Sequence, residues 1–166
     1  MGEPADLPDF SVAERDFSTV DKARLVSSLS RVLPAASLLH DLEDLRPYEC
    51  DGMSALRQVP MVVALPETEA QVVEILKICA ALGVPVVARG AGTGLSGGAQ
   101  PHKFGLVLSL ARFKKIIRID AHARRAVVQP GVRNLAISEA AAPFGLYYAP
   151  DPSSQIACTI GGNVAE

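Results

Sequence analysis

The sequence has few cysteines and no long apolar run, and both absences exclude classes of protein. Cys50, Cys79 and Cys158 lie far apart and form no C-x-x-C pair, so neither a zinc knuckle nor a disulfide framework is indicated. This cysteine usage is typical of a reducing compartment, and we expect a cytoplasmic protein. The longest apolar runs, such as 61–65 and 84–88, are far shorter than the roughly 20 residues that span a bilayer, so we expect no direct membrane insertion.

The sequence also lacks a block of residues that carry charge of one sign. The formal net charge is -2 over 166 residues, and acidic and basic residues are spread along the chain, so we expect no nucleic-acid partner. His40, His102 and His122 have no metal-ligand spacing, so we predict no metal site and assign none of them to catalysis. A local basic stretch favours a solvated face over a docking patch. Its members are Arg112, Lys114, Lys115, Arg118, Arg124 and Arg125.

What the sequence does contain is a strand-helix-strand pattern over residues 61–88. The apolar, β-branched run at 61–65 predicts a buried strand. Thr68 and Gln71 have capping-box spacing, and a broad apolar face that ends at Gly83 predicts a helix. The run at 84–88 predicts the next strand, and such a unit is usually a right-handed parallel crossover.

The other predicted elements complete an α+β pattern. They are a flexible leader over the first 16 or so residues, a helix from Ser18 to before Pro34, an extended lead-in over 35–60, strands at 106–110, 116–120 and 125–129, and a helix from about 133 to 142 with Gly145 at its C-terminal cap. The leader is acidic and contains proline, unlike a signal peptide. The strands suggest a mixed sheet. We predict a leader and helix over residues 1–50 and a domain over residues 51–166.

A glycine-rich loop follows the strand at 84–88 directly, in the segment 89–98. Glycine tolerates positive φ and lacks a Cβ atom, so successive N–H groups can converge on a phosphate oxygen. Thr93 and Ser96 add hydroxyl donors, and Arg89 is the one cation of the segment. The loop therefore predicts a phosphate site, with a tightly turned surface loop as the alternative.

The residues after the loop restrict which phosphate ligand fits. The pattern that begins at Gly92 matches G-x-G-x-x-G, but a Rossmann loop runs directly into a long helix. Gly98, Pro101 and Gly105 follow too closely for such a helix. No Gly-Lys-Ser/Thr follows, which excludes a nucleoside-triphosphate P-loop. We predict a phosphate loop that does not initiate a helix.

Three sequence blocks resemble one family. The segment 85–98, P-V-V-A-R-G-A-G-T-G-L-S-G-G, resembles the pyrophosphate loop of the vanillyl-alcohol-oxidase-type, or p-cresol-methylhydroxylase-type (PCMH-type), FAD domain. V-Q-P-G-V at 128–132 and Y-A-P-D-P-S-S-Q-I-A-C-T-I-G-G-N-V-A at 148–165 agree in order and spacing. Within the family, the sequence resembles most the FAD-binding catalytic subunits of bacterial glycolate oxidases. The segment at 46–52, which leads into the domain, shares this resemblance. The resemblance begins at about residue 35.

This resemblance implies an α+β fold of the PCMH type, with a strand-helix-strand subdomain and a mixed sheet with flanking helices, truncated within the domain. It also implies an extended FAD. The glycine loop would hold the pyrophosphate, the turn at 130–131 would lie near adenine, and the turn at 150–154 and the block at 159–163 would lie near the flavin. A simple turn is the alternative for Gly161 and Gly162. The implied contacts are Arg89, Gly90, Ala91, Gly92, Thr93, Gly94, Leu95, Gly97, Gly98, Pro130, Gly131, Pro150, Asp151, Pro152, Ser153, Ser154, Thr159, Gly161, Gly162 and Asn163.

The mode of cofactor attachment follows from one position of the loop. Some members attach the flavin through a histidine there, and Thr93 stands at that place, so the resemblance implies non-covalent FAD. Cys158 lies in the flavin-proximal block, where contact with the cofactor and simple buried packing are both compatible with its position.

The resembling enzymes oxidise a small 2-hydroxy acid, such as glycolate or D-lactate, by hydride transfer to the flavin. Their substrate domain and a histidine-containing catalytic segment follow the region matched here, so the catalytic residues stay unknown and we expect this chain alone to be inactive. The resemblance implies a second flavin-type subunit and an iron–sulfur subunit as partners, at the inner face of the cytoplasmic membrane. The residues alone leave two alternatives open, a stand-alone FAD- or nucleotide-binding module and an unrelated α/β structural domain.

Overall fold

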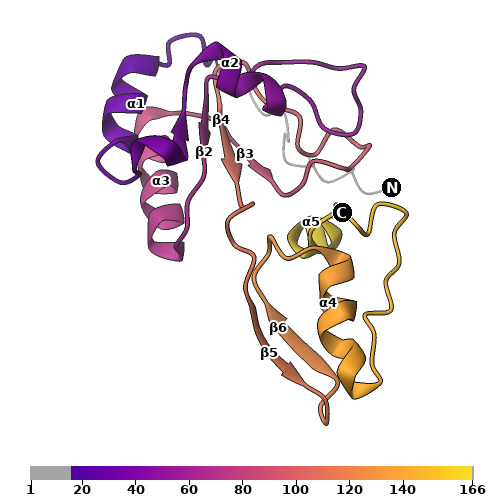
Figure 1. Ribbon diagram of the computed structural model, residues 1–166. Coiled ribbons are helices and arrows are strands. Elements are labelled where there is room, and N and C mark those ends of the chain that lie inside the picture. The colour runs from indigo at the N-terminus through magenta and orange to yellow at the C-terminus, as the bar shows by residue number, and fades with distance from the viewer. Residues whose placement is uncertain (1–15, 166) are drawn as a thin grey trace, which may run out of the picture.

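The computed structural model describes residues 16–165, which form two lobes joined by one passage of chain (Figure 1). The N-lobe, residues 16–110, contains a four-stranded sheet, and the C-lobe, residues 116–165, contains a two-stranded sheet. Nearly all of the predicted leader lies outside the described residues. Within the described part, no helix has the length and apolar character needed to cross a membrane.

The N-lobe sheet has the order β1-β2-β4-β3 and is mixed, as predicted. Strand β1 (Leu38–Leu39) pairs antiparallel with β2 (Val62–Ala64), whereas β2 and β3 (Val86–Arg89) both pair parallel with β4 (Leu106–Ser109). The predicted strand-helix-strand unit is present, and its two strands flank β4. Every residue of β4 is buried, as befits a central strand of a parallel sheet.

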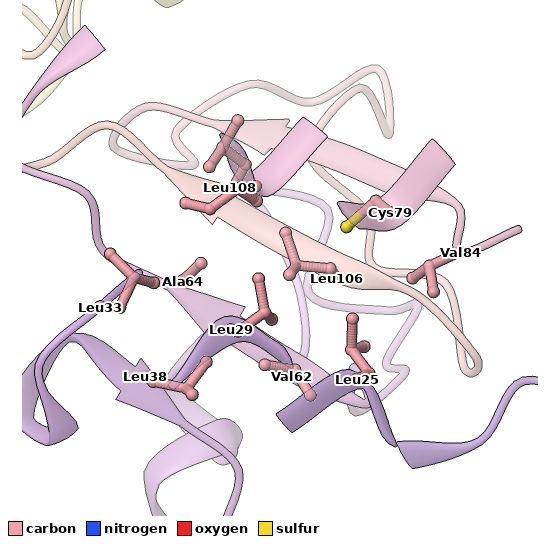
Figure 2. Close-up of a cluster of buried hydrophobic side chains, with 11 residues drawn as sticks. Leu25, Leu29, Leu33, Leu38, Val62, Ala64, Cys79, Val84, Leu106 and Leu108 are labelled. Carbon is pink, nitrogen blue, oxygen red and sulfur yellow. The ribbon is translucent and has the colours of Figure 1, made fainter. Parts of the chain in front are cut away.

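Two helices cover one face of this sheet. Helix α3 (Glu69–Leu82) has the predicted capping box, in which Thr68 and Gln71 each bond to the other's backbone, and it ends at Gly83 with φ 66°. Helix α1 (Lys22–Leu29) begins later than predicted, because Asp21 accepts from the Arg24 N–H and caps the helix instead of Ser18. Figure 2 shows the core that the two helices close against the sheet. Its buried members are Leu25, Leu29, Leu33, Leu38, Val62, Ala64, Ile75, Cys79, Val84, Leu106 and Leu108.

The extended lead-in predicted for 35–60 is wrong, because this segment contains several short elements. They are η1 (Ala35–Ser37), β1, α2 (Leu42–Leu45) and η2 (Arg46–Tyr48). Leu45 packs against Val63 and Val107, whose side chains alternate to the face opposite the α1–α3 core. Elements this short have no measurable hydrophobic period, so tertiary burial rather than local pattern forms them.

The C-lobe contains a second sheet, separate from the mixed sheet of the N-lobe. Strands β5 (Ile116–Asp120) and β6 (Arg125–Val128) pair only with each other, as an antiparallel hairpin whose turn holds Arg124 at φ 51°. The predicted helix is present as α4 (Asn134–Ala141), extended by η3 (Ala142–Phe144) to Gly145 at φ 68°. A further helix, α5 (Ile160–Ala165), stands where a glycine-rich turn was considered.

The passage between the lobes is anchored on both sides. Arg112 donates to the Ser37 hydroxyl and to the Glu67 carboxylate, each at 2.6 Å, and to the Ala36 carbonyl at 3.0 Å. The sequence predicts a solvated basic face that includes Arg112. Arg112 instead forms part of the connection between the lobes. On the C-lobe side, the Gly131 N–H donates to the Phe113 carbonyl at 2.7 Å, and a Cβ at Gly131 would collide with the Leu110 carbonyl.

Candidate functional site

A cleft of 380 Å³ lies where the two lobes meet, and its walls are two segments far apart in the sequence. One wall is the glycine loop that leaves the carboxyl end of β3, and the other is the segment that leads into and forms α5. The carboxyl end of a parallel strand is the usual location of a ligand in such sheets. The residues that line the cleft are Ala88, Gly90, Ala91, Gly92, Thr93, Gly94, Ser96, Gly98, Ala99, Cys158, Thr159, Gly162, Asn163 and Ala165.

The glycine loop has the predicted form, because it leaves β3 without entering a helix. Gly92 and Gly97 have φ of 72° and 78°, values at which other residues are strained. Within residues 16–165, the N–H groups of Ala91, Gly92 and Thr93 donate to no backbone carbonyl. Successive unpaired N–H groups beside a cleft form a concavity that suits an anion.

The opposite wall approaches the loop so closely that it leaves no room for a side chain. A Cβ at Gly90 would collide with the Thr159 hydroxyl. Thr159 itself is fixed to the start of α4 through its bridge to Arg133 and through the bond from the Asn134 N–H to the Cys158 carbonyl, at 3.0 Å. Glycine at position 90 is therefore required by contact between the lobes.

Two polar atoms of the C-lobe wall are buried without a hydrogen-bond partner among the described residues. They are the Thr159 Oγ1 and the Asn163 Nδ2, and both residues line the cleft. A buried polar group without a partner costs about 1–3 kcal/mol, so such groups in a cleft are typical of a ligand site. Together with the loop amides, they offer donors to an oxygen-rich, anionic ligand.

Nine of the predicted contact residues are brought together in the cleft. They are Gly90, Ala91, Gly92, Thr93, Gly94, Gly98, Thr159, Gly162 and Asn163. Gly131 lines a second hollow, also of 380 Å³, which shares Gly90, Ala91 and Thr159 with the first and contains Lys114 and Arg133. The two hollows therefore lie on either side of a shared stretch of the loop.

The remaining predicted residues lie outside the cleft lining. They are Arg89, Leu95, Gly97, Pro130, Pro150, Asp151, Pro152, Ser153, Ser154 and Gly161. Several of them support the C-lobe wall: the Pro130 carbonyl accepts from the Gly161 N–H at 2.9 Å, and the Ser154 carbonyl accepts from the Cys158 N–H at 2.8 Å. The Pro150 carbonyl accepts from the Asn134 side chain at 3.1 Å.

The contact residues predicted from the sequence do not include five members of the cleft lining, Ala88, Ser96, Ala99, Cys158 and Ala165. Cys158 lies next to Thr159 in the block at 148–165, which resembles the family, and this position is the signal that could have indicated it. The sequence alone does not show whether its side chain faces the cleft. Cys158 is the one residue of the cleft lining with an ionisable side chain. The lining residues can therefore bind a ligand through amides and hydroxyls, but they include no carboxylate, imidazole or amine to accept a proton. Among residues 16–165, no group of His, Cys, Asp and Glu is arranged to hold a metal ion.

Comparison with known proteins gives a consistent result. Residues 60–166 match a family model described as an FAD binding domain. The chain is 59% identical over 147 residues to the glycolate oxidase subunit GlcD of Escherichia coli (strain K12), covering 89% of this chain and 30% of that protein. It is 39% identical over 104 residues to a D-lactate dehydrogenase of Archaeoglobus fulgidus, covering 63% of this chain and 23% of that protein.

The fold also matches a solved structure. The structure of p-cresol methylhydroxylase with substrate bound superimposes with a TM-score of 0.67 and 25% identity, covering 75% of this chain and 25% of that one. The PCMH-type fold predicted from the sequence is thereby confirmed. The chain spans about 30% of the length of the first curated relative that it matches.

Proposed function

We propose that this chain is the cofactor-holding part of an oxidoreductase that oxidises a small 2-hydroxy acid. The chain belongs to the family of FAD-binding domains, and the proposal starts from this membership. FAD is the cofactor, and the residues present fit it. The observation that supports this most is the cleft between two glycine segments, with unpaired loop amides on one wall and two unpaired polar atoms on the other. We also propose that residues 51–166 form the FAD-binding unit.

The loop amides of residues 91–93 would hold the diphosphate of FAD, since successive N–H groups bind an anion without a bulky side chain between them. On the other wall, Thr159 and Asn163 would bond to the oxygen atoms of the cofactor and so satisfy their own buried atoms. Gly131 and the hollow around it would accept a further part of the extended cofactor. Bound FAD supplies the acceptor for the hydride of the substrate. Attachment would be non-covalent, since Thr93 is no nucleophile for the flavin ring.

The substrate class rests on the relatives. One is named as a subunit of a glycolate oxidase and another as a D-lactate dehydrogenase, so glycolate and D-lactate are the substrates to test. The relative's name as a subunit supports a multi-subunit assembly, for which we propose a second flavin-type subunit and an iron–sulfur subunit. We propose a cytoplasmic location, at the inner face of the membrane when assembled.

The 166-residue chain would bind FAD but not oxidise the substrate by itself. Oxidation of a hydroxy acid needs a group that accepts the hydroxyl proton, and the cleft lining holds no carboxylate, imidazole or amine for that step. The residues of the cleft would hold and orient the cofactor and exclude water from its diphosphate side. The proton acceptor would come from residues beyond those of the cleft.

Titration of the purified chain with FAD, followed by quenching of flavin fluorescence and by gel filtration, tests the proposal. We expect saturable binding of FAD that is tighter than the binding of riboflavin, which lacks the diphosphate. Addition of glycolate or D-lactate with a dye acceptor should give no turnover. An unrelated domain would show no flavin affinity, and dye reduction by the chain alone would contradict the proposed division of roles.

A further inference from the structure

The support beneath the glycine loop centres on Arg89, the last residue of β3. This side chain is only 9% exposed, although it is a cation at the edge of a cleft. Its Nη1 donates to the Cys50 carbonyl at 2.7 Å, and its guanidinium carbon lies 5.6 Å from the centre of the Tyr48 ring. A Cβ at Gly92 would collide with the same guanidinium. Arg89 is therefore packed between the loop and the segment at 48–50.

A second set of contacts joins the same two segments. The Gly52 N–H donates to the Gly94 carbonyl at 2.9 Å, and a Cβ at Gly52 would stand 2.7 Å from the carbonyl oxygens of both Thr93 and Gly94. The Gln100 side chain donates to the Leu56 carbonyl at 3.2 Å. Gly52, Leu56 and Gln100 themselves do not line the cleft. The segment at 48–56 also precedes residues 60–166, which match the family of FAD-binding domains.

The charge of Arg89 is buried without an acidic partner. Among the described residues, no carboxylate lies within salt-bridge distance of its guanidinium. A planar guanidinium is well suited to this place, because it can donate to a carbonyl and stack on an aromatic face at the same time. A buried cation next to unpaired amides also adds to the positive potential that those amides present.

We infer that Arg89 is a positioning residue of the FAD site, which acts through the loop rather than by contact with the cofactor. This inference rests on the proposed function. Arg89 bridges the loop to Tyr48 and Cys50 and so keeps the amides of residues 90–94 in the arrangement that binds a diphosphate. A loop without this bridge would adopt that arrangement only part of the time, and the apparent affinity falls by the fraction of competent molecules.

Replacement of Arg89 tests the inference, with FAD and riboflavin as the two probes. Arg89→Met removes the bridge, and Arg89→Lys keeps the charge but has no planar fork. We expect both variants to bind FAD about tenfold or more weakly, as for a loop that is competent a tenth of the time. Riboflavin, which has no diphosphate, should bind each variant as it binds the wild type. Arg57→Met is the control, because it removes an exposed cation next to the same segment whose side-chain bonds go to Glu49 and to the Ser54 carbonyl rather than to the loop.

Hydrogen exchange gives a readout that a general loss of stability would not imitate. In the free Arg89→Met chain, the amide of Gly52, which donates to the Gly94 carbonyl of the loop, should exchange faster while those of β4 keep their protection. Should Arg89→Met fail to fold, Tyr48→Leu weakens the same support, and we expect a rise in the FAD Kd of about threefold that Tyr48→Phe does not produce.

Three results would overturn the inference. Normal FAD affinity in Arg89→Met would show that the bridge is dispensable. Normal affinity in Arg89→Lys alone would instead indicate a direct contact between the charge and the phosphates. Unchanged exchange of the Gly52 amide would exclude a role in presetting the loop. A wild-type chain that binds no FAD would overturn the proposed function together with this inference, and so is distinguishable from the other three.

Discussion

The two lobes differ in how far they bury their own apolar residues. The N-lobe has cores on both faces of its sheet, and Val62, Val63, Leu106 and Val107 are fully buried. In the C-lobe, apolar residues of β5, β6, η3 and α5 and of the loops between them are exposed, including Ile117 at 64%, Tyr147 at 77% and Val164 at 79%. The cleft nevertheless needs a wall from each lobe. We therefore expect the N-lobe to be the more stable platform for the loop amides and the C-lobe to supply the second wall from a less stable unit.

The largest expected effect compares one isoleucine in each lobe. Ile75 on α3 lies in the closed core, whereas Ile137 on α4 borders a hollow of 320 Å³. We expect Ile75→Ala to lower the free energy of unfolding by about 2–5 kcal/mol, and Ile137→Ala to lower it by about 1–2 kcal/mol, since contacts on one side are already missing. Urea unfolding measures both. Equal losses would contradict the proposed difference between the lobes.

The second prediction concerns the C-lobe wall. One substitution there should keep or raise the stability of the free chain and at the same time lower its affinity for FAD. Thr159→Val removes a buried hydroxyl that has no partner, so the free chain should be as stable as the wild type or more stable. FAD affinity should fall about tenfold to a hundredfold, the value of a hydrogen bond to a charged group. Thermal unfolding and FAD titration provide the two measurements, and Thr159→Ser, which retains the hydroxyl, is the control. Wild-type affinity in Thr159→Val would remove Thr159 from the site.

A third, smaller effect is confined to the N-lobe. Thr68→Ala removes the N-cap of α3, and we expect a loss of about 1 kcal/mol in the free energy of unfolding. FAD affinity should stay unchanged, because α3 covers the sheet and contributes no residue to the cleft. Thr68→Ser retains the oxygen and should be close to the wild type. A change in FAD affinity on Thr68→Ala would mean that the stability of the helix layer and the cofactor site are coupled.

The smallest effect is a pH dependence of the N-lobe core. Burial raises the pKa of the Cys79 thiol from 9.0 to about 11. The unfolded chain loses this proton above pH 9, while the folded chain retains it, so the contribution to stability is complete below pH 9 and is lost as the pH rises through about 11. Urea midpoints between pH 8 and 11 should fall more steeply for the wild type than for Cys79→Ala. Parallel curves would contradict a buried, protonated thiol.

Sequence patterns were sufficient where the physical signal is local. The capping box at Thr68, the left-handed end at Gly83 and the glycine loop that avoids a helix each depend on a few adjacent residues, and the structure confirms them. Nine of the predicted cofactor contacts line one cleft, because the family blocks carried that information.

Patterns failed where long-range packing decides the conformation. Strand β1 is two residues long and exists through its pairing with β2, and α5 forms in a glycine-containing segment whose start is held by the Val132 carbonyl. The β5–β6 hairpin stands apart from the main sheet because Gly131 and Phe113 set the direction of the connection. No pattern revealed that Arg89 faces Cys50 beneath the loop.

FAD titration of Gly90→Ala beside Thr68→Ala tests the central claim, that FAD binds where the two lobes meet. The new methyl at position 90 collides with Thr159 on the opposite wall, whereas Thr68 caps α3 outside the cleft and controls for a general loss of stability. We predict that the wild type binds FAD, that Thr68→Ala stays within about threefold of it, and that Gly90→Ala binds at least about tenfold more weakly, since a clash worth over 1.4 kcal/mol separates the walls. Wild-type affinity in Gly90→Ala would contradict a site shared between the lobes.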